Sequence, residues 1–237
     1  TGTLSLADMM VRQTASGPDW STWHNSSTGS AWMSLWSKPG TRRATARTHA
    51  LDSLVTDSAA GGSAWGCGQH INNGCINVLP DGRQLMPILI RAKQSGKATG
   101  IVTTARVTHA TPASFYANCP RRDHEGMIGA QLLERGIDVA LGGGRAFFPK
   151  EELAKHPDVR IVNHAAELRA APADGRLLGI FASGHVPYVL DRDATRPGLV
   201  EMSQVALARL EKHPGGFALQ IEAGRVDHAA HNNDAAS

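Results

Sequence analysis

An acid–serine pair followed by small residues is the first feature of this chain that could do chemistry. Asp57 and Ser58 precede the small residues of 59–63, which can begin a helix directly at the serine. The first turn of a helix has unpaired N–H groups and a partial positive charge, so it favours an anion. A hydroxyl there suits attack on a phosphate or acyl group once a base or a metal activates it. The same residues also fit a plain helix cap, so both interpretations stay open.

A second group of polar residues follows an apolar stretch near the end of the chain. Glu222 ends the predicted strand 217–221, a usual place for a hard-cation ligand. Asp227 and His231 are four residues apart, so on a helix they share one face and could bind one Zn²⁺. His228 faces a neighbouring direction and could contact substrate. The alternative is a helix N-terminus with acidic caps and solvated histidines.

A third group lies in the middle of the chain. Pro112 suits the first turn of a helix and Thr111 suits its cap. His109 is either a structural histidine or a ligand. Of the adjacent pair Arg121-Arg122, one guanidinium in a cleft would clamp two phosphate oxygens, although adjacent arginines are more often solvated.

The elements that must position these residues form a pattern of apolar strands alternating with helices. Strands are predicted over 98–105, 137–141, 177–182 and 217–221, and helices near 85–94, 112–118, 124–135 and 199–210. Charged residues dominate 150–160, and no element is predicted there. The alternation predicts an α/β fold with a mostly parallel central sheet and helices on both faces. Ligands bind at the carboxyl ends of such strands, where the polar groups and the glycines of 142–144 fall.

Composition limits the class of protein. The 237 residues are predicted to form one domain, 1–237, with an irregular Trp-rich segment over 1–40. The net charge of +3 comes without a long basic run, so nucleic acid is not the expected partner. No apolar run approaches the ~18 residues of a membrane span, and no signal peptide is evident, so the chain is either cytosolic or a mature form. Cys67 and Cys75 are close enough in sequence for a disulfide, and free thiols are the alternative.

Three motifs together resemble the alkaline phosphatase family. They are TDSAAGGSAWGCG, VTTARVTHATPASFY followed by two arginines, and LQIEAGRVDHAAH, in the family's order and approximate spacing. The resemblance runs from about residue 40 to 234. It implies an alkaline-phosphatase-like fold, here truncated, and a phosphomonoesterase with two Zn²⁺ and one Mg²⁺.

The resemblance also implies roles for single residues. Ser58 matches the nucleophile, which forms a phosphoserine intermediate and contacts metal, and Asp57 positions it. Arg122 matches the arginine that holds the phosphoryl oxygens. Thr111 and Glu222 match Mg²⁺ ligands, and Asp227 and His231 match ligands of the first Zn²⁺. His109 and His228 occupy positions where some members carry Asp and Lys, and are expected to contact substrate.

The chain also departs from the family pattern. The Asp-Gly-x-Gly turn that supplies a bridging aspartate is not found, and the Asp-His pair and further His expected beyond His231 are absent. We therefore expect a partial chain that binds zinc weakly and hydrolyses phosphate esters poorly, unless ligands come from elsewhere, as across a homodimer. The alternatives are a phosphate- or metal-binding remnant and a phosphodiesterase- or sulfatase-like relative. The family resemblance implies a periplasmic or extracellular location.

Overall fold

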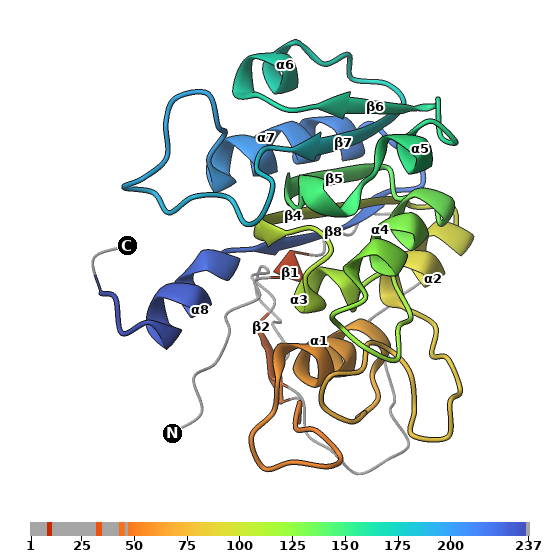
Figure 1. Ribbon diagram of the computed structural model, residues 1–237. Coiled ribbons are helices and arrows are strands. Elements are labelled where there is room, and N and C mark those ends of the chain that lie inside the picture. Colours follow the sequence, from red (N-terminus) through yellow and green to blue (C-terminus); the bar gives the residue numbers. More distant parts are fainter. Residues whose placement is uncertain (1–8, 11–31, 35–42, 46, 236–237) are drawn as a thin grey trace.

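The centre of the molecule is a six-stranded sheet with the order β1-β8-β4-β5-β7-β6 (Figure 1). The computed structural model describes residues 9–10, 32–34, 43–45 and 47–235. The strands of the sheet are β1 (Met9–Met10), β4 (Ala98–Arg106), β5 (Val139–Gly143), β6 (Val159–Val162), β7 (Arg176–Ile180) and β8 (Phe217–Glu222). β1 is antiparallel to β8, and the other neighbouring strands are parallel. β2 (Trp32–Ser34) and β3 (Arg43–Thr45) form a separate antiparallel pair. The predicted mostly parallel α/β fold is confirmed.

Helices cover both faces of this sheet. They are α1 (Ser58–Cys67), α2 (Ile88–Gln94), α3 (Ala110–Ala113), α4 (Glu125–Glu134), α5 (Lys150–Leu153), α6 (Ala165–Ala170), α7 (Leu199–Leu210), α8 (Gly224–His231) and the 3₁₀ turn η1 (Arg145–Phe147). α7 has the bounds that its apolar spacing predicts, and its Met202, Ala206 and Leu210 are buried.

Alternation along the strands divides the core in two. Ile101 and Ala140 pack with α1 to α4 on one face, whereas Val102, Val139 and Leu141 pack with α6 and α7 on the other. Successive strand residues point to opposite faces, so strands buried on both sides are apolar throughout. This explains why these segments read as continuous apolar runs in the sequence.

The parallel register brings the strand ends to one edge. Gly100 of β4 pairs with Val139 of β5 and with Leu219 of β8, so the three strands run side by side in one direction. Their carboxyl ends, with that of β7, therefore meet at the same edge, which the loops leading to α3, η1 and α8 cover.

Some expectations need correction or fall outside the described residues. The charged region 150–160 and the residues that follow it contain α5, β6 and α6, none of which is predicted from the sequence. Most of the Trp-rich segment 1–40 lies outside the described residues. Cys67, Cys75 and Cys119 are free thiols. In the part of the chain that the structure describes, no helix is long and apolar enough to cross a membrane.

Candidate active site

Ser58 is the first residue of α1, and Asp57 caps that helix. The Asp57 Oδ1 atom accepts from the N–H of Ala60 at 2.9 Å, which satisfies one of the helix's unpaired donors. Oδ2 accepts from the main-chain N–H of Gly74 at 3.1 Å and from Nη1 of Arg122 at 2.9 Å. The cap and the functional interpretation of this segment are therefore compatible. The capping carboxylate holds an arginine beside the serine.

The two adjacent arginines have different surroundings. Arg121 is exposed, and its Nη2 lies at the long distance of 3.8 Å from Oδ2 of Asp123, which is also exposed. Arg122 is largely buried, and its second Nη contacts Nε2 of His109 at 3.2 Å. A guanidinium held by two partners keeps a fixed orientation, which planar recognition of an oxyanion requires.

Close packing of α1 against α3 places Ser58 near the next motif. A Cβ at Gly62 would lie 3.3 Å from Cα of Thr111, and one at Gly66 would lie 2.1 Å from the carbonyl oxygen of Ser114. Only glycine allows the two helices to approach this closely. The run of small residues after Ser58 thus serves helix packing.

Glu222, at the end of β8, is a buried carboxylate among hydroxyls. Its Oε2 accepts from Oγ1 of Thr103 at 2.6 Å, and the Thr111 hydroxyl also hydrogen-bonds to it. Burial raises the pKa of Glu222, with these hydrogen bonds opposing the shift. A buried carboxylate beside two hydroxyls is a set of hard oxygen donors.

Asp227 and His231 lie on one face of α8, as their spacing predicts. Oδ1 of Asp227 is 3.6 Å from Nε2 of His231, and the His231 side chain is 74% exposed. These two side chains are thus an accessible carboxylate–imidazole pair. Asp227 is near enough to Glu222 to raise its pKa further.

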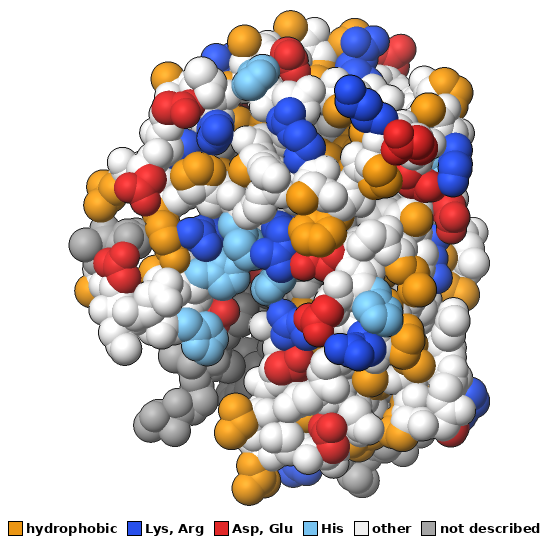
Figure 2. Space-filling model, in the orientation of Figure 1, with side chains coloured by type: hydrophobic (Ala, Val, Ile, Leu, Met, Phe, Trp, Pro, Cys, Tyr) orange, Lys and Arg blue, Asp and Glu red, His pale blue; other side chains and the backbone are white. Residues whose placement is uncertain are grey.

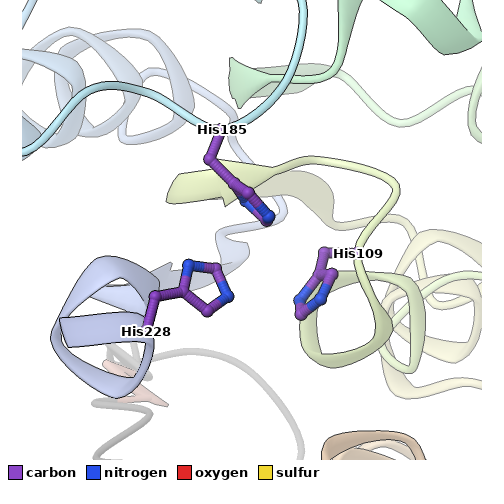
Figure 3. A group of neighbouring side chains, drawn as sticks. All are labelled: His109, His185 and His228. Carbon is purple, nitrogen blue, oxygen red and sulfur yellow. The ribbon is translucent and has the colours of Figure 1, made fainter. Parts of the chain in front are cut away.

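Three histidines converge between these groups (Figure 3). His109 follows β4, His185 follows β7 and His228 lies on α8, and one nitrogen of each ring lies within 4.8 Å of the others. Burial, with nearby arginines, lowers the pKa of His109 to about 2 and that of His185 to about 3. Burial also lowers the pKa of His228. The three rings are therefore neutral at neutral pH.

A buried ion pair and a glycine run position His185. Arg106 is held by Glu125, with Nη2 2.6 Å from Oε1, and the Thr108 hydroxyl donates to the same carboxylate at 2.6 Å. Nη1 of Arg106 lies 2.5 Å from Nε2 of His185. On the other side, a Cβ at Gly143 would lie 2.1 Å from the carbonyl oxygen of Gly184, so the loop carrying His185 packs directly on the backbone. Figure 2 shows histidine, basic and acidic side chains gathered near the centre of this face.

Comparison with known proteins identifies the family. A model of the alkaline phosphatase family matches residues 41–237. This chain belongs to the alkaline phosphatase family.

Several relatives in this family are similar over most of the chain. Alkaline phosphatase 4 of Bacillus subtilis is 35% identical, with 77% of this chain and 42% of that protein covered. The repressible alkaline phosphatase of Saccharomyces cerevisiae is 38% identical, with 81% and 40% covered. The crystal structure of Thermus thermophilus alkaline phosphatase matches with a TM-score of 0.75 at 46% identity, over 79% of this chain and 42% of that one. The chain thus spans about two fifths of these relatives.

Within this alkaline phosphatase fold, the residues that the sequence singled out fall into linked groups. Asp57 contacts Arg122, Arg122 contacts His109, and the His109 ring centroid is 5.4 Å from that of His228. Thr111 lies beside Glu222, but its predicted role as helix cap is wrong: His109 is the N-cap of α3, and Thr111 lies inside the helix.

Two site residues, His185 and Glu125, are missing from the sequence interpretation, and a third, Arg106, is interpreted there only as one of the polar residues that follow strand 98–105. His185, Arg106 and Glu125 complete the cluster at the carboxyl edge. The signal for His185 was present, since it follows the strand 177–182 as His109 follows 98–105. Glu125 gives no such signal, because it lies inside the helical pattern of α4.

Proposed function

We propose that this chain carries the phosphate-binding and nucleophilic part of a phosphomonoesterase, with Ser58 as the nucleophile. The observation that carries the proposal is the Asp57–Arg122 contact at 2.9 Å beside the first turn of α1. It combines a hydroxyl, the positive end of a helix and a fixed guanidinium, which is what transfer of a dianionic phosphoryl group requires.

In this proposal the Ser58 oxygen attacks phosphorus while the bond from phosphorus to the ester oxygen breaks. The serine proton passes to solvent, and the departing alkoxide takes a proton from solvent. Water then attacks the phosphoserine, releasing inorganic phosphate and restoring the hydroxyl. Arg122 uses N–H groups outside its contacts with Asp57 and His109 to hold the phosphoryl oxygens, and His109 and His228 contact the substrate.

The side chains fit the metal ions that the family resemblance implies. Glu222, Thr111 and the neighbouring Thr103 offer buried oxygen donors suited to Mg²⁺. Asp227 and His231 offer the oxygen and nitrogen donors that suit a first Zn²⁺, and Ser58 offers an oxygen donor to a second. A bound divalent cation supplies charge neutralisation and lowers the pKa of a hydroxyl that it contacts. A solved structure of a TAB5 alkaline phosphatase variant is described with Mg bound in its M3 site, which supports the oxygen-donor part of this assignment.

The second candidate function is phosphate and metal binding without turnover. It is favoured by the pair of Asp227 and His231, which supplies two ligands where catalytic zinc takes three protein ligands. A homodimer in which a second subunit supplies ligands, and a periplasmic or extracellular location, remain proposals from the family resemblance.

Hydrolysis of a chromogenic phosphate monoester, with and without Zn²⁺ and Mg²⁺, tests the proposal. We expect metal-dependent turnover that Ser58→Ala lowers roughly 10³-fold or more, because the covalent route is lost. Radiolabelled phosphate should be incorporated into the wild-type chain and not into Ser58→Ala. Ser95→Ala is the control, since that exposed hydroxyl at the end of α2 donates only to the carbonyl of Arg91.

The outcomes separate the two candidates. Turnover that survives Ser58→Ala would overturn the nucleophile assignment. Absence of turnover, together with phosphate binding that survives Ser58→Ala, would favour binding alone. Hydrolysis of phosphodiesters in preference to monoesters would move the chain to the diesterase alternative.

A further inference from the structure

The three histidines at the carboxyl edge resemble a three-nitrogen metal site, but their hydrogen-bond partners are those of an anion site. Among the described residues, every hydrogen-bond contact of the three rings is with an N–H group of an arginine. The contacts are Arg122 Nη2 to His109 Nε2 at 3.2 Å, Arg106 Nη1 to His185 Nε2 at 2.5 Å, Arg106 main-chain N to His185 Nδ1 at 3.2 Å, and Arg225 Nη1 to His228 Nδ1 at 3.0 Å.

His109 and His228 have one such contact each, and it fixes which nitrogen of the ring carries the proton. Arginine never gives up its protons in proteins, so a ring nitrogen that accepts from it must hold the lone pair. The other nitrogen of His109 and of His228 then carries N–H. A histidine bound to a metal is arranged the other way, with its second nitrogen donating to a carboxylate or carbonyl. A ring with one nitrogen accepting and the other carrying N–H is neutral, so His109 and His228 offer N–H donors without being charged.

Arg225 is the guanidinium of this cluster whose charge is uncompensated. Arg106 is paired with Glu125 and Arg122 with Asp57. Within the described residues, no carboxylate oxygen lies within 4.0 Å of the Arg225 nitrogens, and its Nε is buried without a hydrogen-bond partner. One face of the guanidinium is covered by Tyr188, whose ring centroid is 3.6 Å from Cζ. An unpaired N–H on a charged, partly buried group is unfavourable until an anion accepts from it.

We propose that Arg225, His228 and Tyr188 form a second oxyanion subsite beside Arg122. It would take a second anionic group of the substrate, so that phosphate monoesters carrying another phosphate are preferred over esters of neutral alcohols. The inference rests on the proposed function, since Arg122 must hold the first phosphoryl group. Two imidazole rings, with centroids 5.4 Å apart, separate the contacts of Arg122 and Arg225. The two anionic groups must therefore be separated by a spacer.

Non-hydrolysable phosphonates test this without requiring turnover. Calorimetry on the metal-free chain would compare alkylphosphonates with α,ω-alkanebisphosphonates of increasing spacer length. We expect the bisphosphonate of matching length to bind about tenfold more tightly than the monophosphonate of the same chain length, because it gains one charge-assisted hydrogen-bonded pair. Arg225→Ala should remove this gain and leave monophosphonate affinity within about twofold.

Arg83→Ala is the matched control, because Arg83 is exposed and paired with Asp81. Arg225→Lys, which keeps the charge, should keep part of the gain and shows that loss in Arg225→Ala is not misfolding. Equal loss of mono- and bisphosphonate binding in Arg225→Ala, or no preference in the wild type, would overturn the subsite and leave the proposed function standing. A wild-type chain that binds neither ligand would overturn the subsite, whereas metal-dependent turnover of the chromogenic ester decides the proposed function separately.

A cobalt titration distinguishes the anion subsite from a metal site formed by the three histidines. We expect the visible spectrum of added Co²⁺ to be the same in the wild type and in His185→Ala. A tetrahedral Co²⁺ spectrum that disappears in His185→Ala would assign the three histidines to a metal and overturn the anion subsite.

Discussion

Arg121 and Arg122 show how neighbouring residues of one type differ once the chain is folded. Arg122 is oriented by Asp57 and His109, whereas Arg121 faces solvent. We expect Arg122→Ala to weaken binding of inorganic phosphate by about 10- to 100-fold, the loss of one charge-assisted hydrogen-bonded pair. Arg121→Ala should change it by less than about twofold, since exposed charges contribute little. Calorimetric titration of phosphate measures both. Equal losses in the two variants would show a general field effect instead of an oriented contact.

Residue types and spacing predicted part of this site and could not predict the rest. Asp227 and His231 are four residues apart, and helix geometry alone places them on one face. The contact between Asp57 and Arg122 joins residues 65 positions apart, so only the family resemblance connected them. Thr111 was assigned to a cap because its type suits one, but the helix begins two residues earlier than that cap implies, and the Thr111 hydroxyl hydrogen-bonds to Glu222 instead. At Thr111, a hydrogen bond between distant parts of the chain outweighs the local preference of threonine for a helix cap.

At the scale of elements, the glycines at the end of β5 decide how closely the loop that carries His185 can pack. The N–H of Gly144 donates to the carbonyl of Gly184 at 2.8 Å, and a Cβ at Gly143 would overlap that oxygen. We expect Gly143→Ala to lower the free energy of unfolding by about 1–3 kcal/mol, the usual result of overpacking. Gly126→Ala is the control, because Gly126 lies in α4 with nothing within 4 Å of its added Cβ. It should raise stability by about 0.4–1 kcal/mol. Urea unfolding measures both, and equal effects would contradict close packing of the loop.

Periodicity predicted the elements that are buried and missed those at the edge of the sheet. β4 and β8 are covered on both faces and read as apolar runs. β6 is the outer strand, and Arg160 and Ile161 within it are exposed, so its sequence lacks a strand signal. The short α5 and α6 contain Glu and Lys or Arg, which gives the same charged composition as a loop. Leu153 of α5 and Leu168 of α6 pack into the two parts of the core, and no local sequence pattern predicts that packing.

At the scale of the whole molecule, a hydrogen bond from the buried core fixes the turn that precedes His109. Tyr116 is fully buried, and its hydroxyl donates to the carbonyl of Val107 at 3.1 Å, two residues before His109. Burial raises the pKa of Tyr116 well above 10. Above pH 10 the unfolded chain releases this proton while the folded chain keeps it. Stability is therefore fully present below that pH and falls as pH rises, by up to about 1.4 kcal/mol per pH unit.

Tyr116→Phe tests this linkage between the core and alkaline pH. The variant loses the hydrogen bond to Val107, so we expect it to be about 1 kcal/mol less stable than the wild type near neutral pH. It has no phenol to ionise, so its stability should fall less steeply above about pH 10, and the two curves should converge. Urea unfolding at closely spaced values from about pH 8 to about pH 11 measures the difference. Parallel curves would mean that Tyr116 ionises in the folded chain, and then alkaline conditions would act on the turn before His109 without unfolding the core.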